Sequence, residues 1–234
     1  MIKLTTASIA AVAMAAVMPM VSANSQVVNN HCNIPVWVHD VLPNRIVRLD
    51  PGQSRGDFTA NGPGVALNFF TGCDDDSAVN CRTGGLNSAA GQKPFMRAES
   101  AFNQNGIPLG YNISPLYGYN MPIKMSSPDT RALICNIQQA CPVYGTDMSC
   151  YSPCCASADG CLGVENCPND PALGPGNNHG APGVHTDFYH SVCPNAYSFA
   201  DDGSAAGHYI YSSGQSTDLT IDLCTSEPSS NWSL

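Results

Sequence analysis

One short segment near the C-terminal end combines several side chains that are useful in chemistry. CPNAYSFADDG, residues 193–203, joins a Cys to an aromatic run and then to two adjacent carboxylates. Carboxylates serve in acid–base catalysis and in cation binding, whereas a Cys in an exported chain usually forms a disulfide. The segment is therefore compatible with a catalytic acid turn, a metal-binding loop or a disulfide-anchored structural corner.

Other spacings that suggest metal sites have simpler explanations. The Cys series between residues 150 and 167 has zinc-like spacing, but disulfides are favoured in an exported chain. The run Asp74-Asp75-Asp76 lacks the spaced ligands of a calcium loop, so we interpret it as a solvated turn. Neither H-E-x-x-H nor G-x-S-x-G occurs. We expect no metal ion and no cofactor.

The first 23 residues indicate export. Lys3 precedes an apolar run at residues 7–21, and Val21-Ser22-Ala23 offers small residues for cleavage. This pattern predicts a secretory signal peptide at residues 1–23. The run is short for a bilayer span, and the C-terminal segment is polar. We expect a secreted, soluble protein that acts outside the cell or in the cell wall.

The charge balance argues against two classes of partner. Nine Lys and Arg stand against 18 Asp and Glu, which gives a formal net charge of −9. Nucleic acids and anionic membranes are bound largely through basic side chains. We therefore expect no nucleic-acid and no membrane partner. The length fits one large domain at residues 24–234, and we expect a monomer.

The Cys content predicts six disulfides. All twelve Cys follow the predicted signal peptide, and only 12% of the residues are charged, alongside 21 Gly and 18 Pro. Such a loop-rich chain needs cross-links, each of which typically contributes about 2–4 kcal/mol. The Cys-dense part reads as a disulfide-tied lobe at about residues 135–192. It would be attached to a body of residues 24–134 and 193–224.

Short strands are expected to build that body. Apolar alternation and β-forming residues mark the segments 27–41, 45–52, 64–72, 94–105, 111–125 and 218–224. The best helix candidate is 185–193, with Thr186 as its N-cap. Many short strands with turns between them predict a mainly β fold, a sandwich.

Six segments, taken in order, resemble the thaumatin-like family. They are VVNNHCNIPVWV, TGCDDDSAVNCRTGG, AESAFNQ, YNISPLYGYNMPIKM, SSPDTRALICNIQQACP and CPNAYSFADD. Together they extend over nearly all of the predicted mature chain. The resemblance implies a β-sandwich body, a disulfide-rich second lobe and a cleft between the two.

The resemblance also implies disulfide pairings. It pairs Cys32 with Cys224, Cys73 with Cys81, and Cys135 with Cys193, which makes Cys193 a structural anchor. The remaining six Cys would pair among themselves, and their fifteen possible arrangements stay open: Cys141, Cys150, Cys154, Cys155, Cys161 and Cys167.

The family's cleft is acidic, and this chain retains only part of it. Glu99 and Asp202 fall on two of its acidic positions, whereas Phe70, Asn112 and Tyr117 replace an Arg and two Asp. Glycoside hydrolysis needs two carboxyl groups in different protonation states. Glu99 and Asp202 are the candidate catalytic pair, but loss of the neighbouring charges argues against hydrolysis.

Aromatic residues take the place of the missing charges. Phe70, Tyr111, Tyr117 and Tyr119 are candidates to stack on sugar rings in the cleft, with Asn112 as a hydrogen-bonding group. The alternative is that these rings pack the sandwich. Strand alternation would place Tyr117 and Tyr119 on one face.

Two N-glycosylation sequons begin at Asn112 and Asn231. Each is a candidate glycan site, and a glycan on Asn112 would lie near the cleft.

Three functions remain open. The first is non-catalytic binding of a cell-wall polysaccharide such as β-glucan. The second is an endo-β-1,3-glucanase with a defence role. The third is an adhesin or effector that binds a surface protein.

Overall fold

The computed structural model describes residues 24–87, 93–161, 167, 180–200, 202, 210–211 and 216–231. The predicted signal peptide at residues 1–23 lies outside these ranges. Within them, none of the helices combines the length and the apolar character needed to cross a bilayer.

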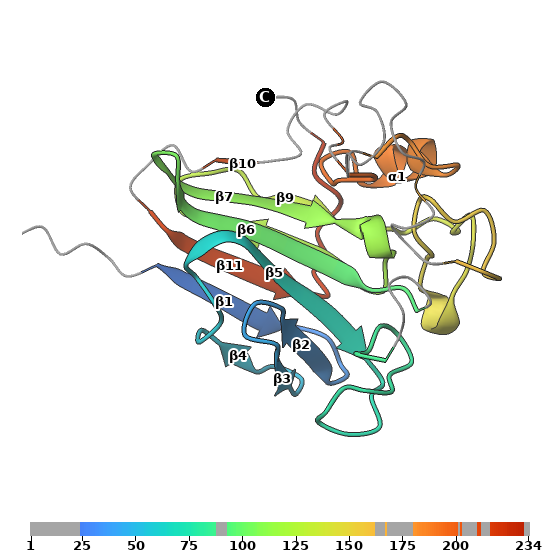
Figure 1. The fold of residues 1–234 in the computed structure, drawn as a ribbon, viewed down its shortest axis with the longest axis horizontal. Coiled ribbons are helices and arrows are strands. Elements are labelled where there is room, and N and C mark those ends of the chain that lie inside the picture. Colours follow the sequence, from blue (N-terminus) through green and yellow to red (C-terminus); the bar gives the residue numbers. More distant parts are fainter. Residues whose placement is uncertain are drawn as a thin grey trace, which may run out of the picture.

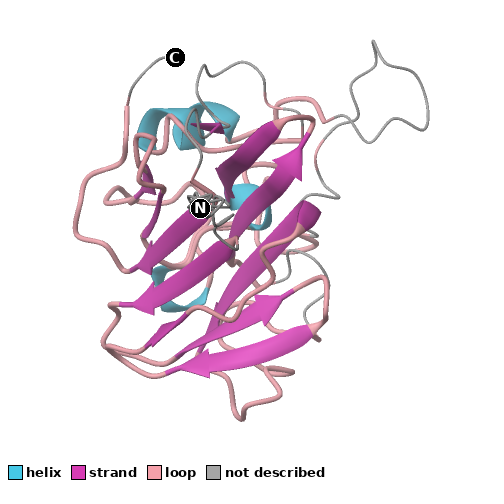
Figure 2. Cartoon of the chain, turned by 90° about the vertical axis from the view of Figure 1, so that its left-hand side faces the viewer, coloured by secondary structure: helices cyan, strands magenta, loops and turns pink. Residues whose placement is uncertain are grey.

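Two β-sheets form the body of the molecule (Figures 1 and 2). The five-stranded sheet has the order β4-β1-β11-β8-β9, and the six-stranded sheet has the order β10-β7-β6-β5-β2-β3. The strands of the first are β1 (Ser25–Asn30), β4 (Ser54–Arg55), β8 (Ile123–Ser126), β9 (Leu133–Cys135) and β11 (Asp218–Leu223). Those of the second are β2 (Val36–Asp40), β3 (Arg45–Leu49), β5 (Gly62–Thr71), β6 (Met96–Gln104), β7 (Ile107–Ser114) and β10 (Ile210–Tyr211).

Helical structure is scarce in the described residues. It comprises the helix α1 (Thr186–Val192) and two short 3-10 turns, η1 (Pro115–Tyr117) and η2 (Thr146–Met148). The Cys-rich segments and α1 gather at one end of the sheets (Figure 1). The predicted helix is confirmed, but its N-cap is His185, and Thr186 is its first residue.

The expected single strand at 27–41 is two strands in different sheets. β1 pairs in parallel with β11, whereas β2 pairs with β3 and β5. The side chain of Asn30 makes the break: it donates to the carbonyls of Ile34 and Leu49 and accepts from the backbone N–H of Cys32. These bonds turn the chain so that it crosses from one sheet to the other.

Strand alternation decides which side chains reach the outer face of the six-stranded sheet. Along β6, Met96 and Ala98 are buried in the core between the sheets, and the intervening Arg97 and Glu99 point the other way. β7 continues the pattern, with Glu99 opposite Asn112.

A tight turn joins β6 to β7. Asn105 and Gly106 have φ angles of 52° and 79°, which is the conformation of a type I′ hairpin with the favoured Asn-Gly pair. This turn fixes the β6–β7 register, and with it the pairs of side chains that face each other on the outer surface.

The expected strand at 111–125 is also interrupted. After β7 the chain forms η1, and Gly118 takes a φ of 107°, so strand alternation does not apply between Tyr117 and Tyr119. The prediction that the two tyrosines share a face is therefore wrong. Tyr119 packs in the core between the sheets. Tyr117 packs on an outer cluster, which consists of Trp37, Phe70, Ala78, Cys81 and Phe95.

Six disulfides cross-link the chain. The three implied pairs are present: Cys32–Cys224, Cys73–Cys81 and Cys135–Cys193. The structure also resolves the pairing that the sequence left open, with the bonds Cys141–Cys150, Cys154–Cys167 and Cys155–Cys161.

Candidate functional site

A groove of about 350 Å³ opens on the outer face of the six-stranded sheet, where β6 and β7 lie beside the segment 197–200. Its floor comes from the two strands and its wall from η1 and that segment. The lining residues are Arg97, Glu99, Asn112, Ser114, Leu116, Tyr117, Tyr197, Phe199 and Ala200. Three of the predicted site residues, Glu99, Asn112 and Tyr117, therefore come together here.

The segment that supplies the wall is held firmly in place. Cys193 is bonded to Cys135, and the backbone N–H of Tyr197 donates to the carbonyl of Ile113 in β7 at 2.9 Å. Tyr197 is half-buried and Phe199 is buried. These two rings were not among the predicted site residues, although they follow the Cys193 anchor in the AYSF run.

Asp202 does not reach the groove. Its side chain is fully buried, and its Oδ2 lies 2.6 Å from His190 Nε2 and accepts from the backbone N–H of Ser198 at 3.0 Å. The bond to Asp202 raises the pKa of His190 above its usual range. The Asp202 carboxylate thus stabilises the turn that contains Phe199. The prediction that Asp202 is a catalytic residue in the cleft is therefore corrected: its side chain is buried and has a structural role.

Glu99 is the carboxylate that the groove does contain. Its side chain is 37% exposed, its Oε1 lies 3.6 Å from Arg97 Nη1, and its Oε2 accepts from Asn112 Nδ2 at 2.9 Å. The charge of Glu99 is therefore opposed by a cation and shared with an amide. A ligand in the groove therefore contacts polar groups whose charges, on Arg97 and Glu99, offset each other.

Arg97 supplies the groove with a cation. The family resemblance puts the Arg of the cleft at the position that Phe70 occupies in this chain. Its guanidinium carbon lies 4.2 Å from the ring centre of Tyr117, and its Nε donates to Asn68 at 2.8 Å. Tyr117 in turn stacks on Phe95 with a centroid distance of 5.0 Å. A sequence signal existed, because Arg97 stands two residues before Glu99 and so shares its face of a strand.

The other three predicted aromatic residues pack instead of lining the groove. Phe70 is 2% exposed and lies under the loop that contains Gly84. Tyr111 is fully buried, and its hydroxyl donates to the carbonyl of Arg131. Tyr119 is 6% exposed and accepts from the backbone N–H of Ile137. The packing alternative holds for these rings.

The two sequons differ in accessibility. Asn112 is 3% exposed, and its amide, the atom that would carry a glycan, is bonded to Glu99. The folded protein therefore does not present it as a glycan acceptor. Asn231 is exposed, and it stays a candidate.

The groove combines apolar and hydrogen-bonding surface. The half-buried Tyr197 offers apolar ring surface, while Arg97 and Glu99 offer hydrogen-bond donors and acceptors. Glu99 is the one carboxylate among the described residues that line the groove. In the part of the chain that the structure describes, no group of three or more His, Cys, Asp or Glu is placed to hold a metal ion.

Comparison with known proteins places the chain in a family. The family model described as the Thaumatin family matches residues 30–225. The pathogenesis-related thaumatin-like protein 3.7 of Cryptomeria japonica is 28% identical over 213 residues, which cover 83% of this chain and 85% of that protein. A thaumatin-like protein of Actinidia deliciosa is 30% identical over 191 residues, which cover 74% of this chain and 78% of that protein.

A solved structure described as a thaumatin-like xylanase inhibitor aligns with 86% of this chain and 99% of its own, at 17% identity and a TM-score of 0.47. The match of the family model to most of the sequence decides the assignment. The chain belongs to the thaumatin family.

Proposed function

We propose that the protein binds a neutral cell-wall polysaccharide, a β-glucan, in the groove between β6, β7 and the segment 197–200, and does not hydrolyse it. The main support for this proposal is the set of residues that line the groove. The half-buried ring of Tyr197 lies beside hydrogen-bonding groups, and the opposite charges of Arg97 and Glu99 are 3.6 Å apart.

The aromatic groups suit the apolar faces of sugar rings. The ring available for stacking is that of the half-buried Tyr197, because Tyr117 already has Phe95 stacked on its ring and the Arg97 guanidinium over it. Tyr197 is fixed through its backbone bond to Ile113. A preorganised surface of this kind favours affinity for a repeating chain of rings.

The carboxylates argue for binding without cleavage. Both retaining and inverting glycosidases place two carboxyl groups on either side of the scissile bond. Here Glu99 is at the groove, and Asp202 is buried against His190 and Ser198. The pair that hydrolysis would need is not assembled at one exposed surface.

Export is part of the proposal. Six disulfides fit an oxidising, extracellular compartment. Two of the relatives are described as pathogenesis-related proteins, which supports a defence role for this chain as well.

A pull-down on insoluble β-1,3-glucan tests the proposal. The mature protein should co-sediment with the glucan, and Tyr197→Ala should weaken binding about tenfold, because loss of one aromatic contact surface costs on the order of 1.4 kcal/mol. Tyr144→Ala is the matched control, since Tyr144 is an exposed tyrosine outside the groove. Equal binding by wild type and Tyr197→Ala would contradict this use of the groove. Absence of binding would favour a protein partner.

A further inference from the structure

We propose that the ligand site extends beyond the groove into a second pocket at the β6–β7 hairpin, so that the protein binds a linear, uncharged polysaccharide chain along these two strands. This inference rests on the proposed function. It adds a second subsite, and with it a required ligand length and shape.

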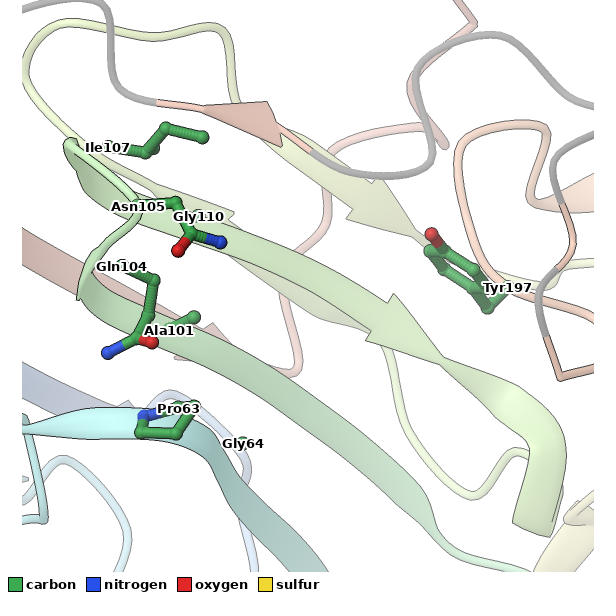
Figure 3. A pocket seen from close by; sticks show the side chains of 8 residues that line it. All are labelled: Pro63, Gly64, Ala101, Gln104, Asn105, Ile107, Gly110 and Tyr197. Carbon is green, nitrogen blue, oxygen red and sulfur yellow. The ribbon is translucent and has the colours of Figure 1, made fainter. Parts of the chain in front are cut away.

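The second pocket has a volume of about 430 Å³ and lies on the same outer face of the sheet. Figure 3 shows Pro63 and Gly64 on one side, the hairpin residues on the other, and Tyr197 facing them across the sheet. Its lining residues are Pro63, Gly64, Ala101, Gln104, Asn105, Ile107, Gly110 and Tyr197.

The two pockets are neighbours, because Tyr197 lines both of them. The strand register supports this placement. On β6 the outward positions run from Glu99 to Ala101, and on β7 the opposite partners are Asn112 and Gly110. From Arg97 to Gln104 the strand rises about 24 Å at about 3.4 Å per residue, which spans several sugar rings.

The floor of the second pocket is low because its central residues are small. Gly110 lies opposite Ala101 in the β6–β7 ladder, and neither carries a side chain longer than a methyl group. Gly64 continues this low surface towards β5. Larger residues at these positions would fill the trough.

The pocket's chemistry selects an uncharged, hydroxyl-bearing ligand. None of its described lining residues is charged, and amides from Gln104 and Asn105 stand beside the apolar surfaces of Pro63 and Ile107. Amides donate and accept hydrogen bonds, as sugar hydroxyls do, without attracting ions. The type I′ turn holds Asn105 in position.

The test is the dependence of affinity on ligand length. Calorimetric titration with β-1,3-linked gluco-oligosaccharides, from the disaccharide to the octasaccharide, should show an affinity gain of about tenfold once the chain is long enough to fill both pockets. Ala101→Trp should remove that gain, because the indole fills the floor of the second pocket. Leu42→Trp, at an exposed position outside both pockets, is the matched control and should retain the gain.

The outcomes separate the two proposals. Binding that reaches a plateau at short lengths in the wild type would overturn the extension and leave the groove intact. A length-dependent gain that survives Ala101→Trp would also overturn it. Absence of binding at every length would overturn the proposed function itself. The thermal unfolding midpoint of each variant shows that it is folded.

Discussion

At the residue scale, burial separates two carboxylates that the sequence presents as a pair. Glu99 faces solvent at the groove, whereas Asp202 is fully buried and bonded to a ring nitrogen and a backbone N–H. The family pattern could identify both positions, but it could not show where each side chain points. Arg97, by contrast, could have been found from the sequence, because it stands two residues before Glu99 and so lies on the same face of the predicted strand.

The buried position of Asp202 predicts a large effect of its removal on stability. Asp202→Ala should lower the free energy of unfolding by about 2–4 kcal/mol, because it removes the bond to the half-buried His190 ring and leaves the buried Ser198 N–H without this acceptor. Urea denaturation at constant pH measures it. Asp57→Ala is the control: Asp57 makes exposed ion pairs with Arg45 and Arg55, so its loss should be about 1 kcal/mol or less. Equal effects would contradict the structural role of Asp202.

The same pair predicts a pH dependence. Because the bond to Asp202, with Asp187 nearby, raises the pKa of His190 when folded, protonation stabilises the native state. That contribution is complete below the unfolded pKa of about 6.5 and is lost as the pH rises through the folded value. The free energy of unfolding should therefore fall above about pH 6.5 in the wild type, and the fall should shrink in His190→Gln. An unchanged pH profile in His190→Gln would refute this assignment.

At the element scale, turns determine what the groove contains. The Asn105-Gly106 hairpin could be predicted from its dipeptide, and the strand character of 94–105 was predicted from alternation. The break between β1 and β2 could not, because it depends on side-chain bonds of Asn30 to residues of other segments. The 3-10 turn η1 was missed for a different reason. It lies inside a β-like sequence and moves Tyr117 onto the outer cluster.

The loop between β5 and β6 gives a test at this scale. Gly84 has a φ of 64°, and an added Cβ would overlap the ring of Phe70. Gly84→Ala should therefore lower the free energy of unfolding by about 2–4 kcal/mol, from left-handed backbone strain together with overpacking.

Gly52→Ala is the matched control for Gly84→Ala. Gly52 has a φ of 78°, but nothing lies within 4 Å of an added Cβ, so only the backbone strain of about 1–2 kcal/mol should remain. Chemical denaturation compares the two variants. Equal losses would show that the loop does not pack tightly on Phe70.

At the scale of the whole molecule, the ends of the described chain are joined to each other. β1 pairs with β11 along its full length, and Cys32–Cys224 closes this union across 192 residues. The sandwich, the six disulfides and three of their pairings were predictable, since these depend on composition and on a family pattern. The placement of two pockets on one face of β6 and β7 was not predictable, because it requires the register of the strands.

The long disulfide should contribute more to stability than the short one. The Cys32→Ser/Cys224→Ser variant should lose about 5 kcal/mol of unfolding free energy, because the native disulfide closes a large loop and so strongly restricts the unfolded chain. The Cys73–Cys81 disulfide closes a separation of only 8 residues, so the Cys73→Ser/Cys81→Ser variant should lose about half as much unfolding free energy. Guanidinium denaturation without reductant measures both. The reverse order would contradict the chain-entropy explanation.

The most direct test of the central claim is to measure bound protein and released reducing sugar in the same incubation with insoluble β-1,3-glucan. We expect the protein to bind and no sugar to be released, because Glu99 is at the groove while Asp202 is buried. Sugar release that Glu99→Gln abolishes would contradict the account, since it would show that the groove hydrolyses its ligand.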